Sequence, residues 1–285
     1  MKKFSDNLSS FISKYAFVAV GICVVTAVIM QVLVFSNLRT MSLSASGAVS
    51  DWGLGFGKAN TRPRGNLSEQ ELEKYDAYFI GGESKTIYLT FDAGYENGYT
   101  AKILDVLKEK QVPAAFFLVS HYIKTEPELV RRMAEEGHIV ANHTNTHPDM
   151  STLTSIDALK AELEPVQQLY RECTGKDMPM FYRPPRGQFS KLNLEHAKQL
   201  GYTTVFWSLA YVDWNVNNQP SPQAAMEKLN GRIHDGAVIL LHSTSATNAE
   251  ILGQLIDSWR DQGYNFGTLY DFRPEKTPQQ SPFAS

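Results

Sequence analysis

The sequence predicts an incomplete, distorted parallel β/α barrel of about seven strands, preceded by one N-terminal transmembrane helix. The barrel is predicted by a regular alternation from residue 86 onward, in which short β-branched, aromatic and aliphatic runs alternate with longer segments of helical periodicity. The helical segments are long enough for right-handed crossovers between parallel strands. An open, doubly wound sheet is the alternative for the same alternation. The transmembrane helix is predicted by a long uncharged run near the N-terminus.

Composition limits the classes of protein to which the chain can belong. With 285 residues and 43% hydrophobic content, the chain can hold one sizeable core. The formal net charge of −3 argues against a strongly basic surface, so we expect no nucleic-acid partner. The two cysteines, Cys23 in an apolar run and Cys173 in a polar turn, are not expected to form a disulfide.

The first 66 residues of the chain predict its cellular location. Residues 1–14 carry lysines and residues 15–35 form the uncharged run, a pattern that favours a cytoplasmic N-terminus, a single membrane span and an extracytoplasmic remainder. Small residues at 44–48 leave a cleaved signal peptide and a secreted protein as the alternative. Residues 36–66 are rich in Ser, Gly and Ala and are predicted to be a linker. A folded domain is expected over 67–275, followed by a C-terminal tail over 276–285.

Each predicted element follows from a local pattern. Ser68 stands three positions before Glu71, which is typical of a short capped helix within 67–78. The next elements are strand 86–91, helix 100–110, strand 114–119, a helix from about residue 126 to 137, strand 138–142, and a helix from about residue 154 that Pro165 should kink or divide. The series continues with strand 180–183, a helix between Ser190 and Gly201, strand 203–208, a helix starting at Ser221 and Pro222, strand 237–241, a helix ending by Gly263, and a last strand near 264–269.

Polar side chains follow five of these strands. The carboxyl ends of the strands of a parallel barrel share one face, so these side chains should lie close together. Any one of them could be a helix cap or a structural loop residue, but together they offer a base, an acid, metal ligands and charge clamps. They are Asp92, then His143 and His147, then Arg183 and Arg186, then Asp213 and Trp214, and finally His242.

His143 and His147 have the spacing of a metal-binding pair. Two histidines four residues apart on a helical turn face the same way, close enough to share one divalent cation. A zinc site normally uses a third protein ligand, so this spacing alone is a partial signal.

Five short motifs carry a family resemblance between about residues 85 and 269. They are Thr90-Phe91-Asp92, His143-x-x-x-His147, Arg183-Pro184-Pro185-Arg186-Gly187, Asp213-Trp214 and Leu240-Leu241-His242. As an ordered set they resemble the motifs of the polysaccharide deacetylases, the family 4 carbohydrate esterases. The segments 94–100 and 183–187 are most similar to the delta-lactam-biosynthetic de-N-acetylases of spore-forming bacteria.

The resemblance implies an acid–base mechanism. Asp92 would be the general base that activates a water, and Arg183 would hold Asp92 in place and keep it ionised. His242 would protonate the departing amine, because an amine anion leaves very poorly. Asp213 would orient His242 and stabilise its charge.

The resemblance also implies a cofactor and a substrate surface. His143 and His147 would hold a divalent cation that polarises the acetamide carbonyl, with zinc expected first and cobalt or manganese as alternatives. Arg186, where many relatives have tyrosine, would contact substrate, and a backbone N–H near it would help stabilise the oxyanion. Trp214, Trp207 and Tyr95 could pack against sugar faces, although core aromatic residues would show the same pattern.

Two alanines depart from the family pattern. Most relatives have an aspartate at Ala93 that completes an Asp-His-His metal set, and an alanine cannot ligate, so we expect the cation to bind weakly. Another carboxylate (Asp92, Glu96 or Asp149) or the substrate could complete the set, or the cation could be dispensable. Ala210 occupies a second position at which most relatives have aspartate.

Together with the N-terminal segment, the resemblance implies a membrane-tethered hydrolase that removes N-acetyl groups from peptidoglycan glycan strands. We expect the target to be N-acetylmuramic acid already stripped of its peptide by an N-acetylmuramoyl-L-alanine amidase, leading to muramic delta-lactam in the spore cortex. The alternatives are an N-acetylglucosamine deacetylase acting on peptidoglycan or a chitin-type polymer, and a non-catalytic relative that binds the cell wall.

Overall fold

The computed structural model describes residues 26, 28–31 and 49–273. Residues 1–48 and 49–285 form two compact units. Segment 1–14, tail 276–285, nearly all of the segment predicted to span the membrane (15–35) and residues 36–48 lie outside the described residues. Within the described part of the chain, no helix is both long enough and apolar enough to cross a bilayer.

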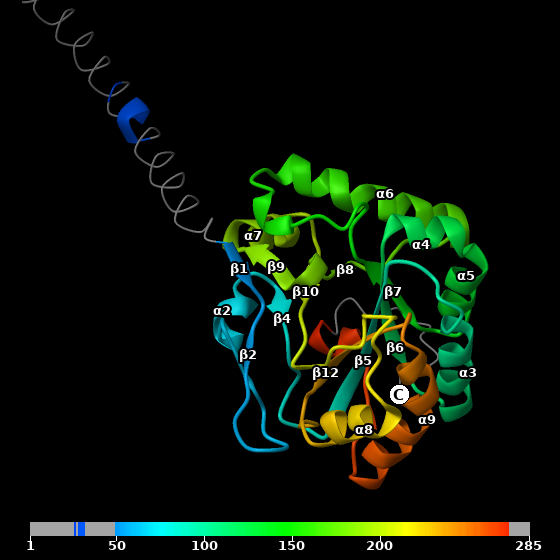
Figure 1. The fold of residues 1–285 in the computed structure, drawn as a ribbon. Helices are drawn as coiled ribbons and strands as arrows, with labels where there is room; N and C mark the ends of the chain where they lie inside the picture. Colours follow the sequence, from blue (N-terminus) through cyan, green and yellow to red (C-terminus); the bar gives the residue numbers. More distant parts are fainter. Residues whose placement is uncertain (1–25, 27, 32–48, 274–285) are drawn as a thin grey trace, which may run out of the picture. The chain divides into compact units, whose positions relative to one another are not determined.

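A curved, mainly parallel sheet forms the centre of the second unit (Figure 1). In spatial order its strands are β11 (Leu209–Ala210), β12 (Val238–His242), β5 (Thr86–Ala93), β6 (Ala114–Leu118), β7 (Ile139–Asn142), β8 (Phe181–Tyr182), β10 (Thr203–Val205) and β4 (Ala77–Tyr78), with β13 (Asn265–Phe266) paired to the start of β5. Among the described strands, β11 and β4 do not pair with each other. An isolated antiparallel bridge pairs Ile80, just after β4, with Ala237, just before β12. The incomplete parallel barrel is therefore confirmed.

Helices pack along the outer side of this sheet (Figure 1). They are α3 (Thr100–Lys110), α4 (Ser120–Thr125), α5 (Pro127–Glu135), α6 (Ile156–Thr174), α7 (Lys191–Gln199), α8 (Pro222–Asn230) and α9 (Ala246–Asp261), with short 3-10 turns at η1 (Met150–Thr152), η2 (Pro185–Gly187) and η3 (Leu269–Phe272). Ser190 and Ser221 cap α7 and α8 through their side chains, as the sequence predicts. Pro165 lies inside α6 without dividing it.

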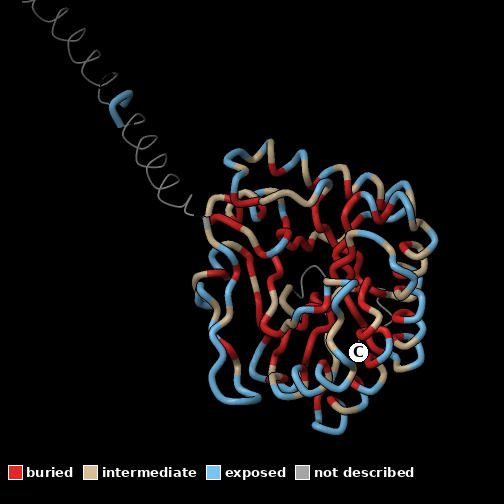
Figure 2. The backbone as a smooth tube through the Cα atoms, viewed as in Figure 1, coloured by how far each residue is buried: buried red, intermediate tan, exposed pale blue. Residues whose placement is uncertain are grey.

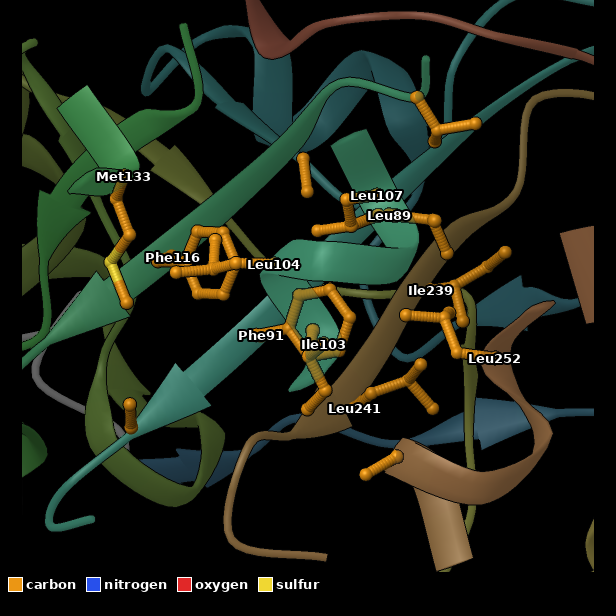
Figure 3. Close-up of a cluster of buried hydrophobic side chains, with 14 of the residues drawn as sticks. Leu89, Phe91, Ile103, Leu104, Leu107, Phe116, Met133, Ile239, Leu241 and Leu252 are labelled. Atoms are coloured by element: carbon orange, nitrogen blue, oxygen red, sulfur yellow. The ribbon is translucent and has the colours of Figure 1, made fainter. Parts of the chain in front are cut away.

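The main core lies between the central strands and the helices. Phe91 of β5 stacks on Phe116 of β6 with ring centroids 5.1 Å apart, and Leu104 of α3 packs against them (Figure 3). Buried residues follow the sheet, and exposed residues follow the outer surfaces of the helices (Figure 2). Because side chains alternate along a strand, Thr90 and Asp92 point to the opposite face of β5, into the barrel.

The N-terminal boundary of the folded unit differs from the prediction. Residues 49–66 belong to the fold: β1 (Val49–Asp51) pairs antiparallel with β9 (Gln188–Ser190), and β2 (Leu54–Gly55) pairs with β3 (Arg64–Gly65). The predicted linker 36–66 is therefore too long. The short capped helix predicted within 67–78 is confirmed, because α2 covers Glu69–Glu73 and the Ser68 side chain accepts the Glu71 N–H; β4 follows it. The strands β1, β2, β3 and β9 are each two or three residues long, so they leave no periodic pattern in the sequence.

Candidate active site

Asp92 is held at the end of β5 by a buried arginine. Asp92 is 6% exposed, and its Oδ1 accepts a hydrogen bond from Nη1 of Arg183 at 2.7 Å. Arg183 follows β8 and is fully buried. Its other donors bind the Thr90 hydroxyl at 2.9 Å and the carbonyl oxygens of Val205 (2.9 Å) and Phe206 (3.1 Å). Among the acceptors of this guanidinium, Asp92 is the one that carries a charge.

The charge state of Asp92 is set by two opposing effects. Burial alone would raise the pKa of Asp92, because a low-dielectric site disfavours the carboxylate. The positive charge of Arg183, its hydrogen bond and contributions from the imidazoles of His143 and His242 together outweigh burial and hold the pKa of Asp92 below its usual value. Asp92 is therefore ionised at neutral pH, and its Oδ2, which Arg183 does not bind, can accept a proton.

His242 ends β12 and is bound by a fully buried aspartate. Its Nδ1 donates to Oδ1 of Asp213 at 2.8 Å, and its backbone N–H donates to Oδ2 of Asp213 at 2.7 Å. Asn248, on the first turn of α9, donates to the same Oδ2 at 2.6 Å and to the carbonyl oxygen of His242 at 3.1 Å. No sequence pattern indicates a role for Asn248, because this role depends on how α9 meets the end of β12.

His242 is placed to act as an acid, and its surroundings favour the protonated imidazole. Burial would lower the pKa of His242, but the hydrogen bond to Asp213 and its negative charge outweigh burial and raise this pKa above the ordinary value. Because Nδ1 is bound to Asp213, Nε2 is the nitrogen left to donate a proton. In the pairing of β12 with β5, His242 lies directly opposite Asp92, so the candidate acid and base occupy the same level of neighbouring strands.

The two candidate metal ligands come together, but not on a helical turn as predicted. Residues 143–147 form a loop in which Thr144 (φ 75°) and His147 (φ 59°) adopt left-handed backbone conformations. The Asn142 side chain accepts the Thr144 N–H at 2.9 Å, and Glu162 accepts both the N–H and the hydroxyl of Thr146. This loop brings the rings of His143 and His147 to a centroid separation of 5.1 Å.

Both imidazoles are in the state that a metal ligand requires. His143 donates its Nδ1–H to the carbonyl oxygen of Arg183 at 2.9 Å, which leaves the lone pair on Nε2. Burial lowers the pKa of His143 to about 4. Burial and the charge of Arg186 also lower the pKa of His147. Both side chains are thus neutral at pH 7.

A third protein ligand is not in place. Within the described residues, no group of three His, Cys, Asp or Glu side chains is arranged to hold a metal ion. Glu96 instead accepts the N–H groups of Tyr99 and Thr100 at the start of α3, and Asp149 accepts the Ser151 N–H of η1. Ala93 is fully buried in the apolar cluster on the helix side of β5. The donor set offers two imidazoles and does not fit the three protein ligands of a usual catalytic zinc site.

A cavity of about 920 Å³ lies over these residues. Asp92, His143, His147 and His242 line it, together with the predicted substrate residues Arg186, Trp214 and Tyr95. Trp214 and Tyr95 are exposed rather than part of the core, so both are available to a ligand. The N–H of Gly187 is already donated to the carbonyl oxygen of Pro184 at 3.0 Å, which removes one of the amides of this turn as an oxyanion donor. Trp207, the third of the predicted sugar-packing aromatic residues, also lines the cavity, and sequence reasoning missed His121, which lines it too.

Comparison with known proteins supports this arrangement. Residues 80–205 match the polysaccharide deacetylase family. The chain is 48% identical over 206 residues to the peptidoglycan-N-acetylmuramic acid deacetylase PdaA of Bacillus subtilis, covering 72% of this chain and 78% of the relative. The solved structure of B. subtilis PdaA, a family 4 carbohydrate esterase, matches with a TM-score of 0.77 and 43% identity, over 81% of this chain and 99% of that one.

A less similar relative is named for a different sugar, N-acetylglucosamine. The peptidoglycan-N-acetylglucosamine deacetylase of Bacillus cereus is 32% identical over 203 residues, covering 70% of this chain and 72% of the relative. The extent and identity of these matches show the family. The chain belongs to the polysaccharide deacetylases, the family 4 carbohydrate esterases, which are hydrolases of N-acetyl amides.

Proposed function

We propose that this chain hydrolyses the N-acetyl group of N-acetylmuramic acid in peptidoglycan, on residues from which the stem peptide has been removed. The main support for deacetylase chemistry is that Asp92 of β5 and His242 of β12 lie opposite each other in neighbouring strands. Amide hydrolysis needs a base for the attacking water and an acid for the leaving amine. Asp92 is ionised at neutral pH, and the raised pKa of His242 favours its protonated form.

The reaction follows from the free atoms of these two residues. Oδ2 of Asp92 takes a proton from water as the water oxygen attacks the acetamide carbonyl carbon. Nε2 of His242 then gives a proton to the amine nitrogen as the C–N bond breaks, which releases acetate and a free amine. Asp213 stabilises the imidazolium and fixes its orientation, while Arg183 fixes Asp92. Each proton transfer of this kind contributes about 10²–10⁴-fold to the rate.

Arg186 supports the choice of muramic acid. Muramic acid differs from glucosamine by a lactyl ether, which carries a carboxylate once the peptide is gone. Among the described residues that line the cavity, Arg186 is the one arginine or lysine, and it is exposed. A guanidinium pairs with a carboxylate through two parallel hydrogen bonds. Arg186 would therefore bind the lactyl carboxylate, in agreement with the name of the B. subtilis relative.

The biological setting follows from this choice of substrate. A free lactyl carboxylate requires prior cleavage by an N-acetylmuramoyl-L-alanine amidase, and the amine released by deacetylation is the one that muramic delta-lactam contains. We therefore place the protein in spore cortex formation, anchored in the cell membrane by residues 15–35 with residues 49–273 outside. Secretion after cleavage of the N-terminal segment is the alternative.

Metal dependence is general in this family. His143 and His147 are the residues of this chain that would hold a divalent cation, zinc before cobalt or manganese, and Ala93 leaves the set one carboxylate short. Binding should therefore be weak.

Mass analysis of muropeptides tests the substrate. The full chain is incubated with peptidoglycan pretreated with an amidase and, in parallel, with untreated peptidoglycan. We expect the loss of one acetyl group from muramic acid, and only in the pretreated sample. Loss of acetyl from glucosamine instead would favour the second candidate, an N-acetylglucosamine deacetylase like the B. cereus relative. Intact substrate in both samples would favour a wall-binding protein.

A further inference from the structure

The turn that carries Arg186 has an unfavourable backbone conformation. Arg186 has φ 57° and Gly187 has φ 70°, so two successive residues are left-handed. Glycine adopts this conformation freely, whereas a residue with a Cβ atom loses about 1 kcal/mol or more. Such a conformation persists only where surrounding contacts enforce it. The contacts of this turn therefore decide where the Arg186 guanidinium lies.

A segment near the N-terminus supplies these contacts. β1 pairs with β9, the strand that begins directly after the turn, with Asp51 opposite Gln188. The backbone N–H of Trp52 donates to the carbonyl oxygen of Gly187 at 2.8 Å. Figure 1 shows β1 lying beside β9. The turn is thus bound to residues more than a hundred positions earlier in the chain.

The indole of Trp52 connects this turn to a second wall of the cavity. Its Nε1 donates to the carbonyl oxygen of Trp207 at 2.9 Å. The ring stacks on Phe206 at a centroid distance of 4.6 Å, and the residue is 7% exposed. Trp207 and Arg186 line the cavity, but Trp52 does not. Trp52 therefore holds the backbone of two cavity-lining segments from behind.

Two glycines show how closely Trp52 fits. A Cβ atom added at Gly187 would lie 2.7 Å from Cβ of Trp52 and 2.8 Å from Cη2 of Trp207. A Cβ atom added at Gly65 would lie 2.4 Å from Cη2 of Trp52. Both distances are well inside van der Waals contact. The indole has no room to move without moving the turn or the β2–β3 hairpin.

We propose that Trp52 is a positioning residue for substrate selection, which holds the 184–187 turn so that Arg186 meets the lactyl carboxylate of muramic acid. This inference rests on the proposed function, because it assumes that Arg186 binds that carboxylate. It places a determinant of specificity outside residues 80–205, the part of the chain that matches the family. Trp52 acts only through Arg186 and Trp207 and does not touch the reacting atoms.

The test separates selection from catalysis with two substrates. One is an N-acetylglucosaminyl-N-acetylmuramic acid glycan with a free lactyl carboxylate, and the other is the same glycan with the lactyl group as its neutral methylamide. For the full-length wild type we expect a KM about 10-fold lower for the carboxylate, which corresponds to one charge-assisted hydrogen bond. Trp52→Ala should abolish this preference by raising the KM for the carboxylate about 10-fold, while kcat and the KM for the methylamide change little.

Three further variants keep the test decisive. Trp52→Phe keeps an aromatic ring but loses the Nε1 donor, so its preference for the carboxylate substrate should lie between those of wild type and Trp52→Ala. Gly65→Ala pushes on the indole without removing it and should also reduce the preference; these two variants decide the matter if Trp52→Ala does not fold. Leu54→Ala is the control, because Leu54 packs against the same aromatic cluster from β2, and it should lower the melting temperature without changing the preference.

The possible outcomes distinguish the two proposals. If wild type shows no preference for the carboxylate, the role of Arg186 in the proposed function fails, and this inference fails with it. If wild type prefers the carboxylate and folded Trp52 and Gly65 variants keep the full preference, the role of Trp52 is overturned while the proposed function stands.

Discussion

Replacing Asp92 by asparagine should damage both turnover and folding. Seen from the sequence alone, the change is isosteric and leaves folding nearly unaffected. The structure alters that expectation, because Arg183 is fully buried and Asp92 supplies the one charged acceptor of its guanidinium. Removing one partner of a buried ion pair costs about 3–5 kcal/mol, since the other charge is left uncompensated. For a domain of this size the melting temperature should fall by roughly 10 °C.

Asp92→Asn should also lose nearly all of its catalytic activity, even where the protein remains folded. An amide cannot take a proton from water, so kcat/KM for acetate release should drop by about 10²–10⁴-fold. The double variant Asp92→Asn/Arg183→Met removes both charges, and the methionine can pack on Phe117, over whose ring the guanidinium now lies at 4.1 Å. We expect most of the lost stability to return in the double variant, with no recovery of activity.

Chemical denaturation and an acetate-release assay measure the two effects separately. Asp105→Asn is the matched control, because Asp105 forms an exposed ion pair with Arg132 on the outer surface, worth at most about 1 kcal/mol. An Asp92→Asn protein as stable as wild type would refute the argument from the buried charge. Near-normal turnover in that variant would remove Asp92 from the chemistry.

Three more results are expected. Asp213→Asn should lower the raised pKa of His242. Because His242 acts in its protonated form, the loss of kcat/KM at high pH should begin at a lower pH than in wild type. An unmoved alkaline limb in the pH–rate profile would exclude His242 as the acid. A mild chelator should remove bound zinc readily from wild type, and calorimetric titration should show weaker binding still after His143→Ala/His147→Ala; equal binding and equal turnover in both proteins would reassign the histidines to substrate support. A fragment starting at residue 49 should fold and deacetylate. A fragment starting at residue 67 lacks the Trp52 contacts and should melt at a lower temperature, because loss of a buried tryptophan side chain costs about 3–5 kcal/mol of folding free energy. Equal melting temperatures of the two fragments would contradict this domain boundary.

The sequence predicted that these residues lie together, because topology alone brings them to one face. Asp92, Arg183 and His242 each follow a recognisable strand, and parallel strands place their carboxyl ends on one face. The hydrophobic alternation in β5 also predicts that Asp92 and Phe91 point to opposite sides, which the structure confirms. The chain order of strands and helices was therefore sufficient to predict the cluster.

The remaining features depend on contacts that no local pattern records. β1 finds its partner β9 far along the chain, and each has only three residues, too few for a strand periodicity. The left-handed residues Thr144 and His147 were expected to be helical, because spacing alone cannot distinguish a helical turn from a loop held by side-chain hydrogen bonds. Asn248 was missed because an asparagine on the first turn of a helix is an ordinary residue.

The register between β5 and β12 restricts how this chain can vary during evolution. Neighbouring strands lie about 4.8 Å apart, and Asp92 and His242 are opposite each other in this pairing. Inserting or deleting one residue within either strand would turn its terminal side chain to the helix-facing side, where Phe91 and Leu241 now pack. Length changes should therefore accumulate among homologues in the helices and in the connections at the other end of the barrel. Within 86–93 and 238–242, descendants of this chain should differ by substitution alone.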